Sequence, residues 1–108
     1  MPLCFLHTNL KESALEDGIE LRIARTIGQI LGKPLEKMNI IIVPGVRLLR
    51  FGTTEPACIL NIHSIAVFDA DRNPTYTPAL KTMLKDELNL PEERCSIVYH
   101  DLDSNFLG

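Results

Sequence analysis

The 108-residue sequence contains no tryptophan, has only 6% aromatic residues and shows no excess of positive charge. Eleven lysines and arginines stand against fourteen aspartates and glutamates, which gives a net charge of −3. Proteins that bind nucleic acid through its phosphates normally need a basic surface, so we expect no nucleic-acid partner. No apolar run approaches the roughly 20 residues of a membrane-spanning helix, so we expect no membrane insertion.

Cysteines are few and form no pattern. Cys4, Cys58 and Cys95 are odd in number and widely spaced, which excludes a disulfide framework and is typical of buried thiols in a reducing compartment. Cys58 has no partner at a C-x-x-C spacing, so a thioredoxin-like redox role is not expected. The first residues lack the basic and apolar regions of a secretory signal. The protein is therefore expected to be cytoplasmic.

Common catalytic and ligand-binding motifs are also absent. The sequence has no G-x-G-x-x-G motif, no phosphate-binding loop, no H-E-x-x-H zinc motif and no G-x-S-x-G nucleophile motif. His7, His63 and His100 lie on three different predicted strands with no second ligand nearby in the sequence. We therefore expect no metal and no cofactor.

Hydrophobic periodicity, interrupted by proline and glycine, divides the sequence into short elements. Apolar residues recur every three or four positions over residues 14–32 and 74–88, which predicts two helices. Runs rich in apolar and β-branched residues predict strands at 2–8, 38–43, 57–67 and 95–102, with a short edge strand at 47–51.

The predicted elements follow the order β-α-β-β-α-β, and we expect them to form a single domain over residues 1–108. Segments 31–41 and 88–98 align at an offset of 57 residues and share leucine, proline, glutamate and isoleucine. This weak repeat favours an α+β fold of two similar halves with a pseudo-twofold axis, in which two helices cover one face of a four-stranded sheet. Strands 38–43 and 57–67 are nearly apolar on both sides, which predicts self-association through the uncovered face.

Pro2 is the candidate catalytic residue that the sequence itself offers. Once the initiator Met1 is removed, the chain begins with a secondary amine at the start of a strand. An α-amino group titrates near pH 8, and burial or a nearby cation such as Lys33 lowers its pKa. The resulting neutral amine is suited to act as a general base. Many chains begin Met-Pro without consequence, so Pro2 as a plain strand residue is the alternative.

Five segments in register along the chain resemble a single family. They are Pro2 with Thr8–Asn9, LGKP at 31–34, FGTTEP at 51–56, HSI at 63–65 and PEER at 91–94. The similarity is collinear and nearly gap-free from Pro2 to about Leu107. In these segments the chain resembles the family of macrophage migration inhibitory factor and D-dopachrome tautomerase.

The resemblance implies the tautomerase fold of that family, assembled as a symmetric homotrimer. It also implies keto–enol tautomerase activity on small α-keto acids such as phenylpyruvate, and on dopachrome-like substrates. Pro2 matches the catalytic proline of the family, Lys33 its substrate-carboxylate lysine, and Ile65 the residue whose backbone meets the substrate. From the residues alone, Lys33 is equally a lysine that stabilises the C-terminal end of a helix dipole.

The sequence departs from the family pattern in three places. Ser96 and Val98 stand where the family often has a tyrosine and an asparagine or arginine. The C-terminal strand of relatives is expected to be missing, because the sequence stops at Gly108. Ala57 and Leu60 replace the cysteines of a C-x-x-C motif, so its thiol redox activity is not expected here. The pocket is therefore expected to be more apolar and more open.

Two other functions stay open at this stage. One is a cytokine-like ligand of a cell-surface receptor with a vestigial pocket, because the resemblance also implies release from cells without a signal peptide. The other is a ferredoxin-like binding module without chemistry. The matches at Pro2, Lys33 and Ile65 favour the tautomerase, whereas Ser96 and Val98 favour the receptor ligand.

Overall fold

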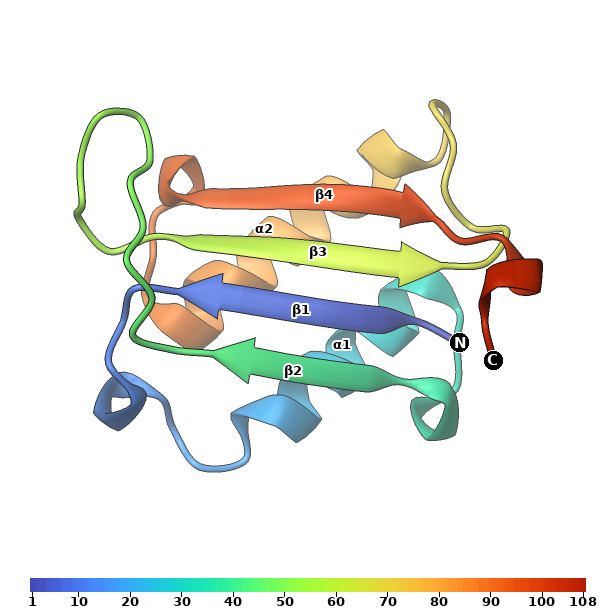
Figure 1. Ribbon diagram of the computed structural model, residues 1–108, viewed down its shortest axis with the longest axis horizontal. Coiled ribbons are helices and arrows are strands. Elements are labelled where there is room, and N and C mark those ends of the chain that lie inside the picture. The colour runs from blue at the N-terminus through green and yellow to red at the C-terminus, as the bar shows by residue number, and fades with distance from the viewer.

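The computed structural model describes residues 1 to 108 and contains a four-stranded sheet and two helices (Figure 1). Figure 1 shows both helices behind the sheet, on the same face. The elements are, in chain order, β1 Leu3–Thr8, α1 Ile19–Leu31, β2 Asn39–Val43, β3 Cys58–Ser64, α2 Asn73–Leu88 and β4 Cys95–Asp101. The predicted α+β fold and the order β-α-β-β-α-β are confirmed.

The strands lie in the order β2-β1-β3-β4. β1 is parallel to β2, β3 is parallel to β4, and the two central strands β1 and β3 are antiparallel to each other. Parallel neighbours need a long crossover connection, and α1 and α2 provide the two crossovers. Each half of the chain is therefore one β-α-β unit.

The two halves also match in detail. The residue after each helix, Gly32 and Asn89, has a left-handed φ of 70° and 55°, respectively. A single turn of 3-10 helix follows in both halves, at Leu35–Lys37 and at Glu92–Arg94. These features repeat at the same 57-residue offset (32 to 89 and 35 to 92) as the sequence similarity, which confirms the pseudo-twofold repeat.

α1 begins at Ile19, so the prediction that the helix starts at residue 14 is wrong. Gly18 precedes the helix with a φ of 80°, a left-handed conformation that a right-handed helix cannot continue through, and Glu12–Ala14 forms only a 3-10 turn. The large buried apolar residues of α1 recur every four positions and are Ile19, Ile23, Ile27 and Leu31. Neither helix is long and apolar enough to cross a membrane.

The hydrophobic core fills the space between the helices and the sheet. Alternate residues of the central strands point into it, among them Leu6 of β1 and Leu60 and Ile62 of β3, all 0% exposed. This alternation is the period of two that a strand with one covered face requires. Burying one such side chain stabilises the fold by about 1.5–3 kcal/mol.

The uncovered face of the sheet is mixed, so the expectation of strands nearly apolar on both sides is wrong for β3. Phe5 of β1 packs edge-on against His63, with the ring centroids 5.7 Å apart. Asn61 and His100 share the same face and are joined by a hydrogen bond of 2.8 Å between Oδ1 and Nε2. An apolar part remains at Ile41 of β2, which is 52% exposed.

Two predicted strands are corrected. Segment 47–51 makes one isolated bridge, between Arg50 and Thr53, because the positive φ of Phe51 (49°) turns the chain after a short extended run. Phe51 and Leu49 are left 75% and 70% exposed. β3 ends at Ser64, short of residue 67, because Ala66 also has a positive φ of 59°.

Candidate active site

The three residues that the resemblance singled out lie at one end of the sheet. Pro2 precedes β1, Lys33 follows α1 and Ile65 follows β3. Nζ of Lys33 donates a hydrogen bond of 3.4 Å to the carbonyl oxygen of Ile65. The charge of Lys33 also acts on the N-terminal amine, whose pKa it lowers. Three separate elements therefore bring a cation, a backbone carbonyl and the start of the chain together.

Pro2 is buried and fixed against β2. Its carbonyl oxygen accepts hydrogen bonds from the backbone N–H of Asn39 at 3.0 Å and from Nδ2 of the same residue at 3.3 Å. The pKa of the Met1 amine is lowered first by burial and then by the charges of Lys33 and Lys37. An amine at this end of β1 is therefore shifted toward its neutral form.

Lys33 owes its position to the way α1 ends. Gly32 adopts the left-handed conformation that closes many helices, and the backbone N–H of Lys33 donates to the carbonyl oxygen of Gly28 at 2.8 Å. A Cβ at position 28 would lie 2.8 Å from the carbonyl oxygen of Lys33, closer than real contacts allow. Glycine at 28 is therefore what lets the chain fold back tightly and present the lysine to Ile65.

Ser96 and Val98 lie on β4, which β3 separates from β1 and Pro2. Val98 is 40% exposed on the uncovered face of the sheet. Within one chain, these two positions are therefore apart from the site that Pro2, Lys33 and Ile65 form.

The other segments of the resemblance meet at the opposite end of β1 and have a structural role. The side-chain amide of Asn9 donates to the carbonyl oxygens of Thr54 and Glu55, and its Oδ1 accepts the backbone N–H of Ala57 at 2.9 Å. Arg94 donates to the carbonyl oxygens of Glu55, Pro56 and Arg50. These bonds hold the loop 51–56 against the sheet.

The structure brings two histidines together that the sequence leaves apart. The rings of His63 and His100 stack with centroids 4.0 Å apart, because parallel pairing places the two residues in register on β3 and β4. Burial, and then the neighbouring His100, lower the pKa of His63. No group of three or more histidine, cysteine, aspartate or glutamate side chains gathers where it could hold a metal ion.

The three cysteines are free and buried. Burial raises the pKa of Cys4 to about 12, so its thiol is protonated at neutral pH. Cys58 lies opposite Cys95 on the neighbouring strand, and this thiol neighbour together with burial raises the pKa of Cys58. A thiol nucleophile is therefore not available at Cys4 or Cys58.

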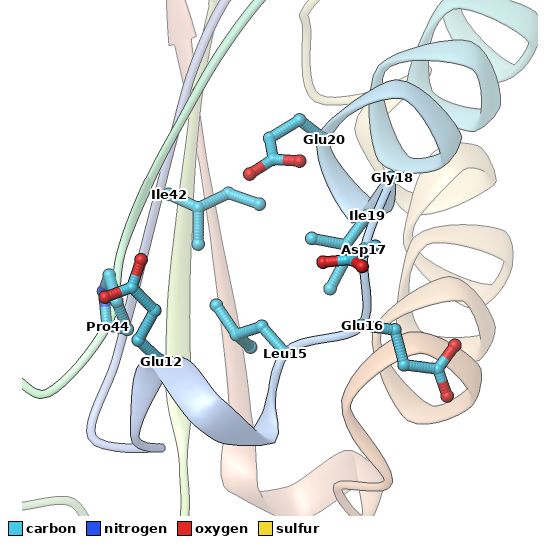
Figure 2. A pocket seen from close by; sticks show the side chains of 9 residues that line it. All are labelled: Glu12, Leu15, Glu16, Asp17, Gly18, Ile19, Glu20, Ile42 and Pro44. Atoms are coloured by element: carbon cyan, nitrogen blue, oxygen red, sulfur yellow. The ribbon is translucent and has the colours of Figure 1, made fainter.

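A hollow of about 200 Å³ lies at the far end of α1, between the start of that helix and β2 (Figure 2). Its lining includes Glu12, Asp17 and Glu20, and no basic residue. In Figure 2 the side chain of Glu16, the fourth acidic residue, points away from the others. A cavity of this charge repels an anionic ligand, unlike the end of the helix at Lys33.

Sequence reasoning missed two residues next to Pro2. Asn39 holds the carbonyl oxygen of Pro2, and Ser64 is a buried hydroxyl at the end of β3. Ser64 belongs to the HSI segment that carried the resemblance, but its neighbours in space become known only with the register of β1 and β3. Asn39 offered no signal, since it looks like an ordinary polar residue at a strand start.

Comparisons with known proteins identify the family of the chain. The family described as macrophage migration inhibitory factor (MIF) matches residues 1–108. The chain is 34% identical over 109 residues to D-dopachrome decarboxylase of Mus musculus, covering 100% of this chain and 92% of the mouse protein. It is 31% identical over 108 residues to the MIF-like protein mif-2 of Caenorhabditis elegans, covering 100% and 90%.

Solved structures show the same fold. The structure of macrophage migration inhibitory factor from Trichinella spiralis matches with a TM-score of 0.93 at 25% identity, covering 98% of this chain and 94% of that one. The tautomerase fold expected from the resemblance is thereby confirmed. With a family match over the whole chain and relatives above 30% identity, the chain belongs to the macrophage migration inhibitory factor family.

Proposed function

We propose that the chain is a keto–enol tautomerase that acts on small α-keto acids or dopachrome-like substrates, with the amine of Pro2 as general base. The observation that carries this proposal is the contact of Lys33 with the carbonyl of Ile65 beside the buried start of β1. Moving a proton between carbon and oxygen needs a base that is neutral near pH 7 and a cation that holds the acid. The name of the mouse relative, D-dopachrome decarboxylase, supports the substrate class.

The roles of the residues follow from their positions. In the keto-to-enol direction the neutral Pro2 nitrogen takes a proton from the carbon next to the keto group, the C–H electron pair becomes the C=C bond, and the carbonyl oxygen takes the charge. The Pro2 ammonium then returns the proton to that oxygen, which gives the enol and restores the neutral amine. The same steps in reverse convert the enol to the keto form. Lys33 holds the substrate carboxylate. Its present bond, to a neutral carbonyl, is long at 3.4 Å, and a carboxylate offers the ammonium a stronger charge-assisted bond.

Removal of Met1 decides whether the base exists. With Met1 attached, the Pro2 nitrogen is an amide and cannot accept a proton. We expect protein without Met1 to convert enol phenylpyruvate to the keto form, and protein that retains Met1 to be inactive. Intact-mass measurement and an absorbance assay on the same samples check this. A folded, Met1-free protein without activity would reject the tautomerase and favour the cytokine-like receptor ligand.

We further propose that the active form is a homotrimer. None of the four hollows in the single chain includes Pro2, Lys33 or Ile65, which supports a site that a neighbouring copy encloses. Leu49 and Phe51 are exposed beyond the sheet, and cyclic closure through one repeated contact would cover them. Light scattering should give three times the mass of the chain. A stable monomer at micromolar concentration would reject the trimer.

A further inference from the structure

Ser64 carries the one buried side-chain polar atom that makes no hydrogen bond to the protein. Ser64 as a whole is 0% exposed. Thr8, the other buried polar residue, is fully partnered: its Oγ1 donates to the carbonyl oxygen of Ala57 at 2.8 Å and accepts the N–H of Leu10 at 3.1 Å. A buried hydroxyl without a partner destabilises a fold, so its presence calls for an explanation.

The register of the two central strands places this hydroxyl beside Pro2. Leu3 pairs with His63 and Cys4 with Ile62, so the next position brings Pro2 opposite Ser64. Because side chains alternate along a strand, Pro2 and Ser64 lie on the helix-covered face, where both are buried. Residues opposite each other on antiparallel strands have Cβ atoms about 4.5–5.5 Å apart. The next residue after Ser64 is Ile65, whose carbonyl oxygen accepts the hydrogen bond from Nζ of Lys33.

We propose that Ser64 is a positioning residue of this site, whose hydroxyl hydrogen-bonds the Pro2 nitrogen, directly or through one water, once Met1 has been removed. The inference rests on the proposed function of Pro2. It also explains why Ser64 has no partner in the chain that begins with Met1. There the Pro2 nitrogen is a tertiary amide with no hydrogen to donate and no basic lone pair.

The hydrogen bond between Ser64 and Pro2 affects the transfer of the proton from the substrate carbon to the Pro2 amine. When the amine takes the proton from the substrate carbon, it becomes an ammonium with two N–H groups. One N–H faces the substrate and returns the proton, while the other is donated to Oγ of Ser64. A hydrogen bond to the charged form of a group is stronger than one to its neutral form, so Ser64 favours the protonated amine. Its removal therefore lowers the pKa of Pro2.

A structural role and a positioning role predict different effects of Ser64→Ala on the pH profile and on Tm. If Ser64 served only the fold, its loss would leave the pH profile unchanged. As a positioning residue without a structural partner, its replacement by alanine should raise Tm by about 4 °C in protein that retains Met1, because an unpaired buried hydroxyl is removed. In Met1-free protein, kcat should fall about tenfold, and the acid limb of kcat/KM should move about one pH unit lower.

The experiment compares Met1-free wild type, Ser64→Ala and Thr8→Val, with the loss of Met1 verified by intact mass. Thr8→Val removes a partnered hydroxyl at the other end of β1, so it should lower Tm and leave the pH profile unchanged. NMR titration of protein labelled at proline reports the Pro2 amine without any assay. An inactive wild type whose Pro2 titration still shifts in Ser64→Ala would reject the tautomerase and keep the contact.

An unchanged Pro2 titration in Ser64→Ala would overturn the inference, whatever the activity. Ser64→Cys guards against a folding failure of the alanine variant. It keeps nearly the same size with a weaker acceptor, so it should give a smaller shift in the same direction. A full shift with cysteine, or none with either variant, would also contradict a hydrogen bond from the Pro2 nitrogen to Ser64.

Discussion

Replacing Pro2 by glycine in Met1-free protein is expected to lower kcat for phenylpyruvate by about 10²- to 10⁴-fold, the contribution of a well-placed general base. Glycine keeps an amine at the start of the chain, so the loss measures placement rather than the presence of a nitrogen. The proline ring is buried, and it fixes the backbone that Asn39 holds through the Pro2 carbonyl. Without the ring, the amine is no longer held within reach of the substrate carbon.

Two controls keep this result specific. Pro2→Gly should still fold, because the hydrogen bonds between Asn39 and the carbonyl oxygen of residue 2 involve backbone that glycine retains, but its Tm should fall because the buried proline ring is lost. Wild-type protein that retains Met1 should show a comparable loss of activity, because its Pro2 nitrogen is an amide and not an amine. Equal activity of the glycine variant and the wild type would show that Pro2 is only a strand residue.

Lys33→Ala is expected to raise KM for an α-keto acid about ten- to a hundredfold, with a smaller effect on kcat. The ammonium holds the carboxylate in the ground state and the transition state alike, and a charge-assisted contact of this kind contributes about 1.5–3 kcal/mol. An ester substrate has no free carboxylate and should be much less affected. Steady-state kinetics on an acid and its ester separate the two.

The same substitution should also change the pH dependence. Lys33 lowers the pKa of the N-terminal amine, so its loss raises that pKa and moves the acid limb of the activity profile to higher pH. Lys37 is the matched control, because it acts on the amine through its charge and is exposed. Lys37→Ala should shift the profile in the same direction and leave KM nearly unchanged. If the acid and the ester lose activity equally and the pH profile does not move, Lys33 only stabilises the C-terminal end of α1.

The fold was predictable because the two halves of the sequence follow the same local rules. Each helix has apolar residues at helical spacing and ends at a residue with left-handed φ, with Pro34 or Pro91 two residues later. The site lies where this repeat breaks. Lys33 corresponds to Leu90, which is 3% exposed and part of the core, so only one half of the chain presents a cation.

Other features depend on contacts between distant segments and left no local signal. The stacked His63 and His100 meet only through the parallel pairing of β3 and β4. Ser64 comes beside Pro2 only through the antiparallel pairing of β1 and β3. The edge strand predicted at residues 47–51 is only an isolated bridge at Arg50, because a short run with apolar residues before a glycine indicates extended backbone, whether or not a neighbouring strand is present to pair with it.

The close approach at Gly28 links the interior of α1 to the chemistry at its end. Gly28 has no functional group, yet the gap that it leaves is filled by the backbone of Lys33, the residue whose charge the proposed reaction needs. A Cβ there would lie 2.8 Å from the carbonyl oxygen of Lys33, so the backbone that carries this side chain has to shift. The helix interior and the proposed substrate-binding cation are therefore coupled. In a library of variants, we expect position 28 to behave like Lys33 and not like the helix residues chosen for packing.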